Sequence, residues 1–407
     1  MANRIAHSAV ILAALAALVL PLRGDIVYSF AGDEDGEYAD TDLVIDREGN
    51  IYGTTVQGGA FNSGTVFQLS PSPTGWAHTV LYSFRGGVDG GEPYKGVTLD
   101  SAGNLYGTAG VGGLYVGPCV DTGCGVVFKL AKSGTTWTYQ LVHSFTGGRD
   151  GFGPGSGVTV DAQGAVYGTT PTGGRLGFGI VYQLKLDSSG TWKERLIHTF
   201  TGGADGLGGS AGRLILTASG GLLGVCTSGG AQGAGNLYQL APTPAGEWTL
   251  TTLYSFQGGT GAGFPYGAVV ADANGNLYGT TYYAGANNLG SIYRLSRSNG
   301  VWTQTALYSF QGGLDGNGPI STLVAATDGN LYGTTSEGGA GCSCGTIFKI
   351  ALDGSTPAYN VVYRFSGAPD GAFIYNGMAR DAAGTTLYGA SVHGGTFNEG
   401  AVFRFTP

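Results

Sequence analysis

The sequence predicts an all-β protein, namely a seven-bladed β-propeller with four antiparallel strands in each blade. Three observations support this prediction. One motif recurs seven times at spacings of 54 to 61 residues, glycine occupies fixed places in each repeat, and the two ends of the chain complement each other. A fixed period of this size is typical of propellers and solenoids. Because each repeat would form one part of a single body, we expect one propeller domain over residues 25–407.

The recurring motif is GNLYGTT, which is complete at residues 275–281. Its other copies, some of them degraded, lie at residues 49–55, 103–108, 164–170, 220–227, 329–335 and 384–390. Leu223 replaces the tyrosine in the fourth copy. The chain contains 79 glycines, and their regular placement predicts many tight turns and not disorder.

Each repeat divides into four short runs rich in Val, Ile, Tyr, Thr and Phe, which predict antiparallel strands a, b, c and d. In the fifth repeat these runs are residues 268–271, 276–281, 290–295 and 302–310. The turn from a to b carries an Asp three residues before a Gly, as in Asp272 and Gly275. This pair is typical of a hairpin turn. Thr217 and Ala326 replace the Asp in two copies.

All five tryptophans stand eight residues before the phenylalanine that closes strand d. The even spacing predicts that both rings lie on one face of an unbulged strand, in an aromatic layer between neighbouring sheets.

The ends of the chain predict ring closure. Residues 26–30 form a d-type strand that precedes the first a strand, whereas the seventh repeat has no d strand of its own. If the N-terminal strand completes the last sheet, every blade has four strands and no sheet edge is left open by the ring.

Charge and the N-terminus narrow the class of partner. The chain has 27 acidic and 19 basic residues and no basic run, which argues against nucleic acid or an anionic membrane surface as a partner. Arg4 followed by the twelve apolar residues 9–20 predicts an export signal within residues 1–24, too short for a membrane span. We expect no membrane span after signal removal, and a monomer.

The combination of YSF, GGxDG, GNLYGTT, GG and GTVF resembles the GloVer tandem repeat of bacterial secreted proteins, often described as choice-of-anchor proteins. The resemblance covers residues 25–407. It implies an exported, extracellular or surface-associated bacterial protein, and it brings no catalytic residues that could be transferred to this chain.

The default binding face is the one where the d-to-a and b-to-c connections emerge, because both are long and glycine-rich. Strand a enters from this face and should place one residue per blade around the central opening: Asp40, Tyr94, Gly155, Ala211, Tyr266, Ile320 and Tyr375. The candidate ligand-binding residues are Asp40, Tyr94, Lys95, Tyr266, Tyr375 and Asn376. The alternative is that these side chains only plug the channel mouth. Aromatic residues of the loops widen the candidate surface: Phe61, Tyr115, Phe178, Tyr282, Tyr283 and Phe397.

Catalytic and metal-binding patterns are weak. The Asp of GGxDG, as in Asp89, is expected to stabilise an Asp-Gly turn, since one carboxylate per blade does not suit calcium. Gly208, Ser210 and Gly212 spell GxSxG, but they precede a propeller strand and not a helix. We expect no cofactor and no metal site.

The cysteines agree with an oxidising compartment. Cys119 and Cys124 lie in the b-to-c loop of the second repeat, where we expect a disulfide. Cys342 and Cys344 are a second candidate pair, although a bridge across one residue would be strained. Cys226 is expected to be buried and free.

These observations favour a secreted, non-enzymatic propeller that binds carbohydrate or a surface protein through its loop face. The alternatives are an extracellular hydrolase or lyase acting on polysaccharide and a purely structural protein of an outer layer. An enzyme would need carboxylates, or a tyrosine with a basic partner, to converge at the channel mouth.

Overall fold

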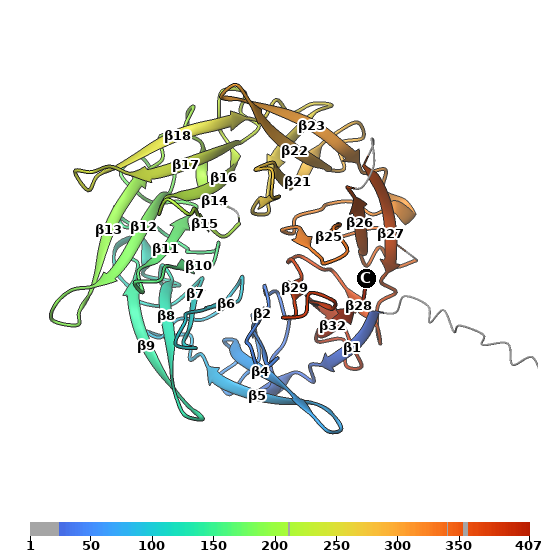
Figure 1. The fold of residues 1–407 in the computed structure, drawn as a ribbon. Coiled ribbons are helices and arrows are strands. Elements are labelled where there is room, and N and C mark those ends of the chain that lie inside the picture. Colours follow the sequence, from blue (N-terminus) through green and yellow to red (C-terminus); the bar gives the residue numbers. More distant parts are fainter. Residues whose placement is uncertain (1–23, 211, 340, 353–356) are drawn as a thin grey trace, which may run out of the picture.

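Seven antiparallel β-sheets surround a central axis (Figure 1). The computed structural model describes residues 24–210, 212–339, 341–352 and 357–407, so the predicted export signal lies outside the described residues except for Gly24. Each sheet contains four or five strands, and consecutive sheets follow one another around the ring. The predicted seven-bladed β-propeller is confirmed.

The blades are built from consecutive strands of the chain. Blades one to three contain β2 (Val44–Ile45), β3 (Ile51–Thr55), β4 (Thr65–Ser72) and β5 (Gly75–Ser83); β6 (Val97–Leu99), β7 (Leu105–Ala109), β8 (Val126–Ser133) and β9 (Thr136–Ser144); and β10 (Val158–Val160), β11 (Val166–Thr170), β12 (Ile180–Leu186) and β13 (Trp192–Thr199). Blades four and five contain β14 (Leu207–Ser210), β15 (Ile215–Leu216), β16 (Leu222–Ser228), β17 (Asn236–Pro242) and β18 (Trp248–Ser255); and β19 (Ala262–Pro265), β20 (Val270–Ala271), β21 (Leu277–Ala284), β22 (Ser291–Ser298) and β23 (Val301–Ser309). Blade six contains β24 (Val324–Ala325), β25 (Leu331–Thr335), β26 (Thr346–Ala351) and β27 (Ala358–Arg364).

The N-terminal strand closes the ring. Blade seven contains β29 (Ala379–Arg380), β30 (Leu387–Ser391) and β32 (Ala401–Phe405), and its outer strand is β1 (Gly24–Ser29). β1 runs antiparallel to β32, with Gly24 opposite Phe405 and Ser29 opposite Ala401. In Figure 1 the blue first strand therefore lies beside the red last one. The predicted three-plus-one blade is confirmed.

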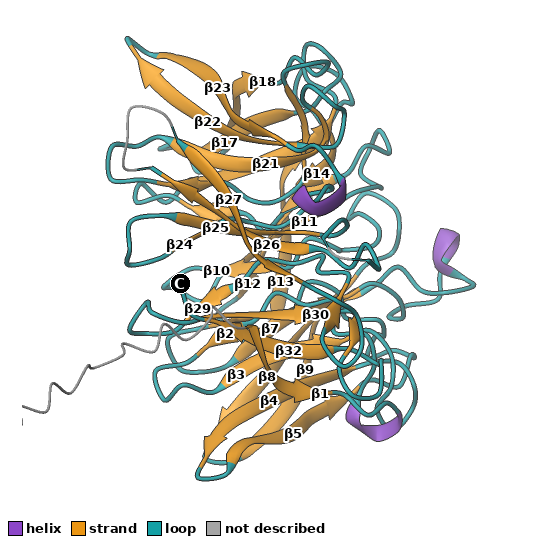
Figure 2. Ribbon diagram, turned by 90° about the vertical axis from the view of Figure 1, so that its right-hand side faces the viewer, coloured by secondary structure: helices purple, strands orange, loops and turns teal. Residues whose placement is uncertain are grey.

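A few short elements lie in the connections between strands. β28 (Gly371–Ala372) pairs with β31 (His393–Gly394) at blade seven. The described part of the chain also contains three single-turn 3₁₀ helices, η1 (Asp33–Asp35), η2 (Gly117–Cys119) and η3 (Gly313–Asp315). In Figure 2 these helices and the longer loops lie on one side of the ring.

The repeated motif has a structural role in strand b and in the turn before it. Asp46 accepts hydrogen bonds from the backbone N–H groups of Glu48 and Asn50 and from the hydroxyl of Tyr52. In the sixth blade, where Ala326 replaces the Asp, Asp328 accepts the hydroxyl of Tyr332 instead. The predicted turn chemistry is confirmed.

The glycine of the LYGTT motif allows close packing across the sheet. A Cβ at Gly53 would lie 2.6 Å from Cζ of Phe67 and 2.9 Å from Cδ2 of Leu43. The ring of strand c therefore covers strand b at a position where no side chain could fit.

Strand d is bulged in every blade, contrary to the sequence prediction. In blade one Phe67 pairs with Val80 and Val66 pairs with Tyr82, which leaves Leu81 as an extra residue. The same shift occurs in the other six sheets. A bulge inverts the alternation of side chains along the strand.

The bulge turns the Trp and the Phe of strand d toward opposite neighbours. Trp76 of blade one contacts Tyr388 of blade seven, with the ring centroids 5.9 Å apart. Phe84, at the end of the same strand, contacts Phe128 of blade two at 5.1 Å. The aromatic layers between blades are confirmed, but the prediction that both rings share one face is wrong.

The core is divided among the seven blade interfaces. Each hydrophobic cluster combines residues of two consecutive blades, as in the cluster of Tyr52 and Phe84 with Leu105, Val126 and Phe128. The hydrophobic core therefore lies between neighbouring sheets and not along the central axis. The central channel is thus left free for other uses.

Candidate functional site

The glycine-rich connections meet on one face of the ring. In every blade the second residue of the b-to-c glycine pair, or its equivalent, donates its backbone N–H to a carbonyl of the d-to-a connection. Gly113 donates to the oxygen of Gly87 and Gly174 donates to that of Gly148, both at 2.9 Å. Figure 2 shows these loops on the right-hand side of the molecule. The predicted loop face exists, and backbone bonds hold its loops to one another.

The first glycine of each pair is required by close backbone contact. Gly58 has a φ of 74°, and a Cβ at this position would lie 2.6 Å from the Cα of Gly36. A side chain here would be strained by its φ and would push the two loops apart. The recurring glycines therefore fix the shape of the loop face. Any binding of a partner on this face depends on the residues between these glycines.

The aspartates of GGxDG serve the turn, as predicted. Asp89 accepts the backbone N–H of Arg85 at 3.1 Å and the hydroxyl of Tyr82 at 2.7 Å. The corresponding donors for the other five aspartates are Ala31 and Tyr28 to Asp35, Thr146 to Asp150, Thr201 and His198 to Asp205, Gln311 and Tyr308 to Asp315, and Ser366 and Tyr363 to Asp370. Within residues 24–407, excluding the few positions left undescribed, no group of three or more His, Cys, Asp or Glu could hold a metal ion.

Three of the predicted site residues meet at the channel mouth. Lys95 Nζ donates to Asn376 Oδ1 at 2.8 Å, and Asn376 Nδ2 donates to Asp40 Oδ1. These side chains come from blades two, seven and one, so the chain of hydrogen bonds bridges one sector of the opening. One side-chain donor of Lys95, one donor and one acceptor of Asn376, and one acceptor of Asp40 are used in these bonds.

The three tyrosines of the mouth have separate surroundings. The Tyr94 hydroxyl donates to Glu92 Oε2 at 2.5 Å, and burial, followed by the Glu92 carboxylate, raises the pKa of Tyr94 above its ordinary range. Tyr266 lies 6.1 Å from the ring of Tyr282. Burial also raises the pKa of Tyr375, and the charge of Asp40 adds to this effect. The hydroxyls of Tyr94 and Tyr375 are therefore held in their neutral form at ordinary pH.

The hollow between these groups is narrow. Lys95, Tyr266, Ile320, Tyr375 and Asn376 line it, and it has room for about one water molecule. Gly155 leaves its sector without a side chain, and residue 211 lies outside the described residues. The mouth can donate and accept hydrogen bonds, whereas a sugar ring would require side chains to move. Carbohydrate binding at this place stays a prediction.

Sequence reasoning missed a charged pair that lies one step deeper in the channel. Arg213 and Asp42 occupy the strand-a position two residues beyond the predicted mouth ring. The Arg213 guanidinium donates to Thr98 Oγ1 at 2.6 Å and to the carbonyl of Lys95 at 3.2 Å, and its Nη2 lies 3.9 Å from Asp42 Oδ2. Arg213 thus extends from blade four to blade two. The sequence did contain a sign of this pair. Among the seven residues at this position, one per repeat, one is basic and one is acidic, whereas the others are glycines or small side chains.

Exposed apolar side chains gather on the loop face. We call the following set the apolar arc: Phe397 of blade seven, Phe61 of blade one, Leu114, Tyr115, Val116 and Val120 of blade two, and Leu176 and Phe178 of blade three. The exposed fractions of Phe61 and Phe397 are 54% and 58%. Tyr283 of blade five is also exposed, whereas Tyr282 is only partly so. The loop aromatics were predicted from the sequence, but their concentration on four consecutive blades was not.

Comparison with known proteins shows the family. The sequence model described as the Gloeobacter/Verrucomicrobia repeat matches residues 119–319 and 210–407. The chain belongs to this family. The resemblance predicted from the repeated motifs is confirmed. No curated protein matches the chain.

Solved structures share the fold at low sequence identity. The chain matches the extracellular domain of a putative hybrid two-component system from B. thetaiotaomicron with a TM-score of 0.55 and 11% identity, covering 94% of this chain and 39% of that one. It matches PorZ, a surface component of the type-IX secretion system of Porphyromonas gingivalis, with a TM-score of 0.52 and 14% identity, covering 93% and 47%. A Dyadobacter fermentans protein of unknown function aligns with a TM-score of 0.48 and 13% identity, covering 96% and 100%. The chain thus spans less than half the length of the first two structures.

In this Gloeobacter/Verrucomicrobia repeat protein, the residues that define the repeat build the scaffold. The Tyr, Asp and Gly positions of the motif form turns, blade contacts and loop-to-loop bonds. Arg213 and Asp42 each occur once at their position in the ring, and the exposed apolar residue two places after the glycine pair (Phe61, Tyr115, Leu176 and Phe397) occurs in four of the seven blades. Features that break the sevenfold pattern are therefore the candidates for function. No helix in the described part of the chain is long and apolar enough to cross a membrane.

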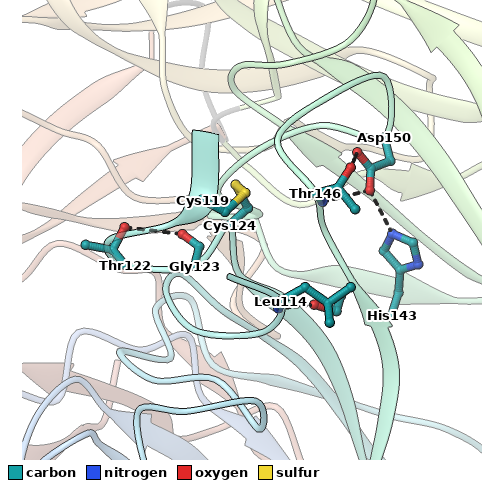
Figure 3. Close-up of a disulfide and its surroundings, with 9 residues drawn as sticks. Leu114, Cys119, Thr122, Gly123, Cys124, His143, Thr146 and Asp150 are labelled. Carbon is teal, nitrogen blue, oxygen red and sulfur yellow. Dashed lines mark hydrogen bonds and ion pairs between the residues drawn. A yellow bond between two sulfur atoms is a disulfide. The ribbon is translucent and has the colours of Figure 1, made fainter. Parts of the chain in front are cut away.

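The cysteines pair as the sequence predicted. Cys119 and Cys124 form a disulfide beside η2, in the loop that carries Tyr115 (Figure 3). Cys342 and Cys344 form the second disulfide. Cys226 is buried and free, and burial raises the pKa of its thiol far above the ordinary value. The first disulfide closes the longest loop of the apolar arc.

The remaining nucleophile and base candidates are part of the scaffold. His143 lies 3.7 Å from Asp150 (Figure 3). It stands at the position of the tyrosine in the YSF motif of strand d. His198 lies 3.0 Å from Asp205 in the matching place of the next blade. Ser210 ends strand β14, which pairs with β16, so the GxSxG sequence does not form a strand-to-helix turn.

Proposed function

We propose that this Gloeobacter/Verrucomicrobia repeat protein is an extracellular binding propeller that docks a partner protein on its apolar arc. The observation that carries the proposal is that eight exposed aromatic and aliphatic side chains lie on four consecutive blades, whereas blades four, five and six contribute Leu207, Tyr283 and Leu314. A contiguous exposed apolar patch marks an interaction site. Within the arc, the contact of Arg85 with Phe61 and the hydrogen bond of Tyr115 to Gly86 connect blades one and two.

The arc is prearranged for binding, which lowers the entropic cost of association. The guanidinium of Arg85 lies over the ring of Phe61, with Cζ of Arg85 5.6 Å from the ring centroid. The Tyr115 hydroxyl donates to the carbonyl of Gly86 at 2.8 Å. Backbone bonds between the glycine-rich loops hold both side chains in place. Rigid aromatic side chains of this kind dominate the binding energy of protein interfaces.

Extracellular location is part of the proposal. The N-terminal pattern of Arg4 and the apolar residues 9–20 and the two disulfides support it. The two structural neighbours described as an extracellular domain and a bacterial surface component are consistent with it.

A photo-crosslinking experiment tests the docking face. A benzoylphenylalanine placed at Phe61 should crosslink a distinct protein of the cell envelope of the producing bacterium. The same group placed at Leu141, on the outer strand of blade two, should not. The variant with Phe61→Ser, Tyr115→Ser, Phe178→Ser and Phe397→Ser should bind the identified protein at least about 30-fold more weakly, since each aromatic anchor can contribute about 2 kcal/mol.

The outer-strand variant Leu141→Ser, Leu196→Ser provides the matched control and should bind normally. Equal binding by the arc variant would contradict the proposal. So would glycan binding that is lost in the variant Tyr94→Ala, Tyr266→Ala, Tyr375→Ala, because that result would place a sugar at the channel mouth instead.

A further inference from the structure

The central channel contains a second hollow on the far side of Arg213 from the loop face. It has a volume of about 280 Å³, near the lower end of the range for ligand pockets. Strand a runs from the loop face toward the a-to-b turns, and the residues that line this hollow follow the mouth residues along that strand. They include Asp42, Arg213, Ile215, Ala268, Thr322 and Val324.

The hollow exists because Arg213 fills only one side of the channel. Its side chain lies over Gly157, where a Cβ would be 3.4 Å from Nε, and reaches Thr98 of blade two. Blades two and three are therefore covered by the arginine. Blades four to seven, together with blade one, line the open half.

The polar groups of the hollow are two opposite charges and one hydroxyl. The three hydrogen bonds of Arg213 go to neutral oxygens, those of Thr98, Lys95 and Val97, at 2.6, 3.2 and 3.4 Å. Asp42 stands 3.9 Å from the guanidinium and accepts the backbone N–H of Gly377 at 3.2 Å. A separation of 3.9 Å leaves both charges able to take a closer partner, since a direct charge-assisted bond is about 2.7–2.9 Å long.

Apolar groups supply the rest of the wall, notably Ile215, Ala268 and Val324. A guanidinium and a carboxylate side by side, next to an apolar wall, complement a molecule with a carboxylate, an ammonium and an aliphatic body. A simple fatty acid would leave Asp42 facing the carboxylate of the ligand, and a simple amine would face Arg213. Only a zwitterion pairs with both charges.

We propose that the channel hollow binds a free aliphatic α-amino acid, with its carboxylate on Arg213, its ammonium on Asp42 and its side chain against Ile215 and Val324. This site is independent of the apolar arc, because it lies in the channel on the other side of the Arg213 plug. The propeller would thus sense or carry a small molecule while its loop face holds a partner.

Three related probes test the proposal by isothermal titration calorimetry on the full chain. Leucine carries both charges, 4-methylpentanoate lacks the ammonium, and 3-methylbutylamine lacks the carboxylate. Leucine should bind saturably, and each of the other two should bind at least about tenfold more weakly, since each loses one charge pair.

Two variants connect the binding to the hollow. Ala268→Leu fills the apolar wall and keeps both charges, and it should weaken leucine binding at least about tenfold. Asp42→Asn should weaken leucine binding but improve that of 4-methylpentanoate, because the repelling carboxylate is gone. The loop-face variant Tyr283→Ala is the control and should bind leucine normally. Each variant is checked by its thermal unfolding curve.

The proposal would be overturned by any of three results. These are no saturable binding of leucine by the folded wild type, equal affinity for all three probes, and unchanged leucine binding by Ala268→Leu. Tighter binding of 4-methylpentanoate than of leucine would also exclude a zwitterion site. None of these results bears on the docking of a protein at the apolar arc.

Discussion

At the scale of single residues, the most unusual ionisable group is Glu194 on the outer strand of blade three. Oε1 of Glu194 is buried and has no hydrogen-bond partner among the described residues. The pKa of Glu194 is raised to about 7, chiefly by burial, with His143 opposing the shift and the charge of Asp150 adding to it. The corresponding positions of blades one and two carry aromatic side chains, those of His78 and Tyr139. The Glu194 carboxylate therefore departs from the other blades, and it belongs neither to the channel mouth nor to the apolar arc.

Glu194 should make stability depend on pH in a defined window. Its pKa is about 7 in the folded protein, against an ordinary value of 4.5. The folded state thus keeps the proton up to a higher pH than the unfolded state. The contribution of Glu194 to the free energy of unfolding is therefore complete below about pH 4.5 and is lost as pH rises toward 7. Glu194→Gln should therefore stabilise the protein at pH 8 by on the order of 1–2 kcal/mol, with solvent screening included. At pH 4.5 it should change little.

Chemical denaturation at the two pH values measures this difference. Glu247→Gln, which removes an exposed carboxylate, is the matched control and should have no pH-dependent effect. An equal shift of stability for Glu194→Gln at both pH values would show that its packing matters and its charge does not.

At the scale of elements, the turns and the bulges explain why the repeat has its sequence. The Asp of the d-to-a turn ties strand d to the loop face through a backbone bond and a side-chain bond. The bulge then directs the Trp and the Phe of one strand into two different blade interfaces. Both devices recur around the ring and position the loops that carry the apolar arc.

The turn aspartates should contribute to stability without any metal. Asp89→Ala removes the acceptor of Arg85 N–H and of the Tyr82 hydroxyl, both partly buried. We expect a loss of about 2–3 kcal/mol, because these bonds go to a charged group and their donors would be left unpaired. Asp121→Ala, in the exposed loop of blade two, is the control and should be close to neutral. Denaturation curves with EDTA and with calcium should coincide, and a loss seen only with calcium would indicate a metal role instead.

At the scale of the whole molecule, stability depends on closure of the ring. β1 contributes the outer strand of blade seven, and its pairing with β32 joins the two ends of the described chain. Without β1, the backbone of β32 would be an unpaired edge, and the cluster that includes Phe30 and Val402 would be exposed.

A circular permutant tests closure directly. Residues 24–31 would be moved behind Pro407 through a short glycine-containing turn, about as long as the two-residue connection of Pro73 and Thr74 between β4 and β5. This variant should unfold within a few degrees of the wild type, because the same strand fills the same place. A variant that lacks residues 24–31 should unfold at a much lower temperature and aggregate. Similar stability of the two variants would show that β1 is dispensable.

The sequence predicted most of the scaffold. Tyr52, Asp46 and their equivalents identified the strands and turns, because local hydrogen bonds and period-two alternation are visible along the chain. It failed at the bulge after Val80, since one extra residue in a strand leaves no compositional mark. Of the site, it found Asp40, Lys95 and Asn376, which meet at the mouth, and missed Arg213 and Asp42, whose contact depends on how far an arginine reaches across the channel.

The amino-acid sequence by itself determined the number of blades, the order of strands, the closing strand, the disulfide candidates and the face that carries the long loops. All of these follow from the period of the repeat and from residue types with strong local preferences. Only the tertiary structure decided which loop aromatics form one surface and which half of the channel Arg213 leaves open. These depend on distances between blades, which bring together residues that lie far apart in the chain.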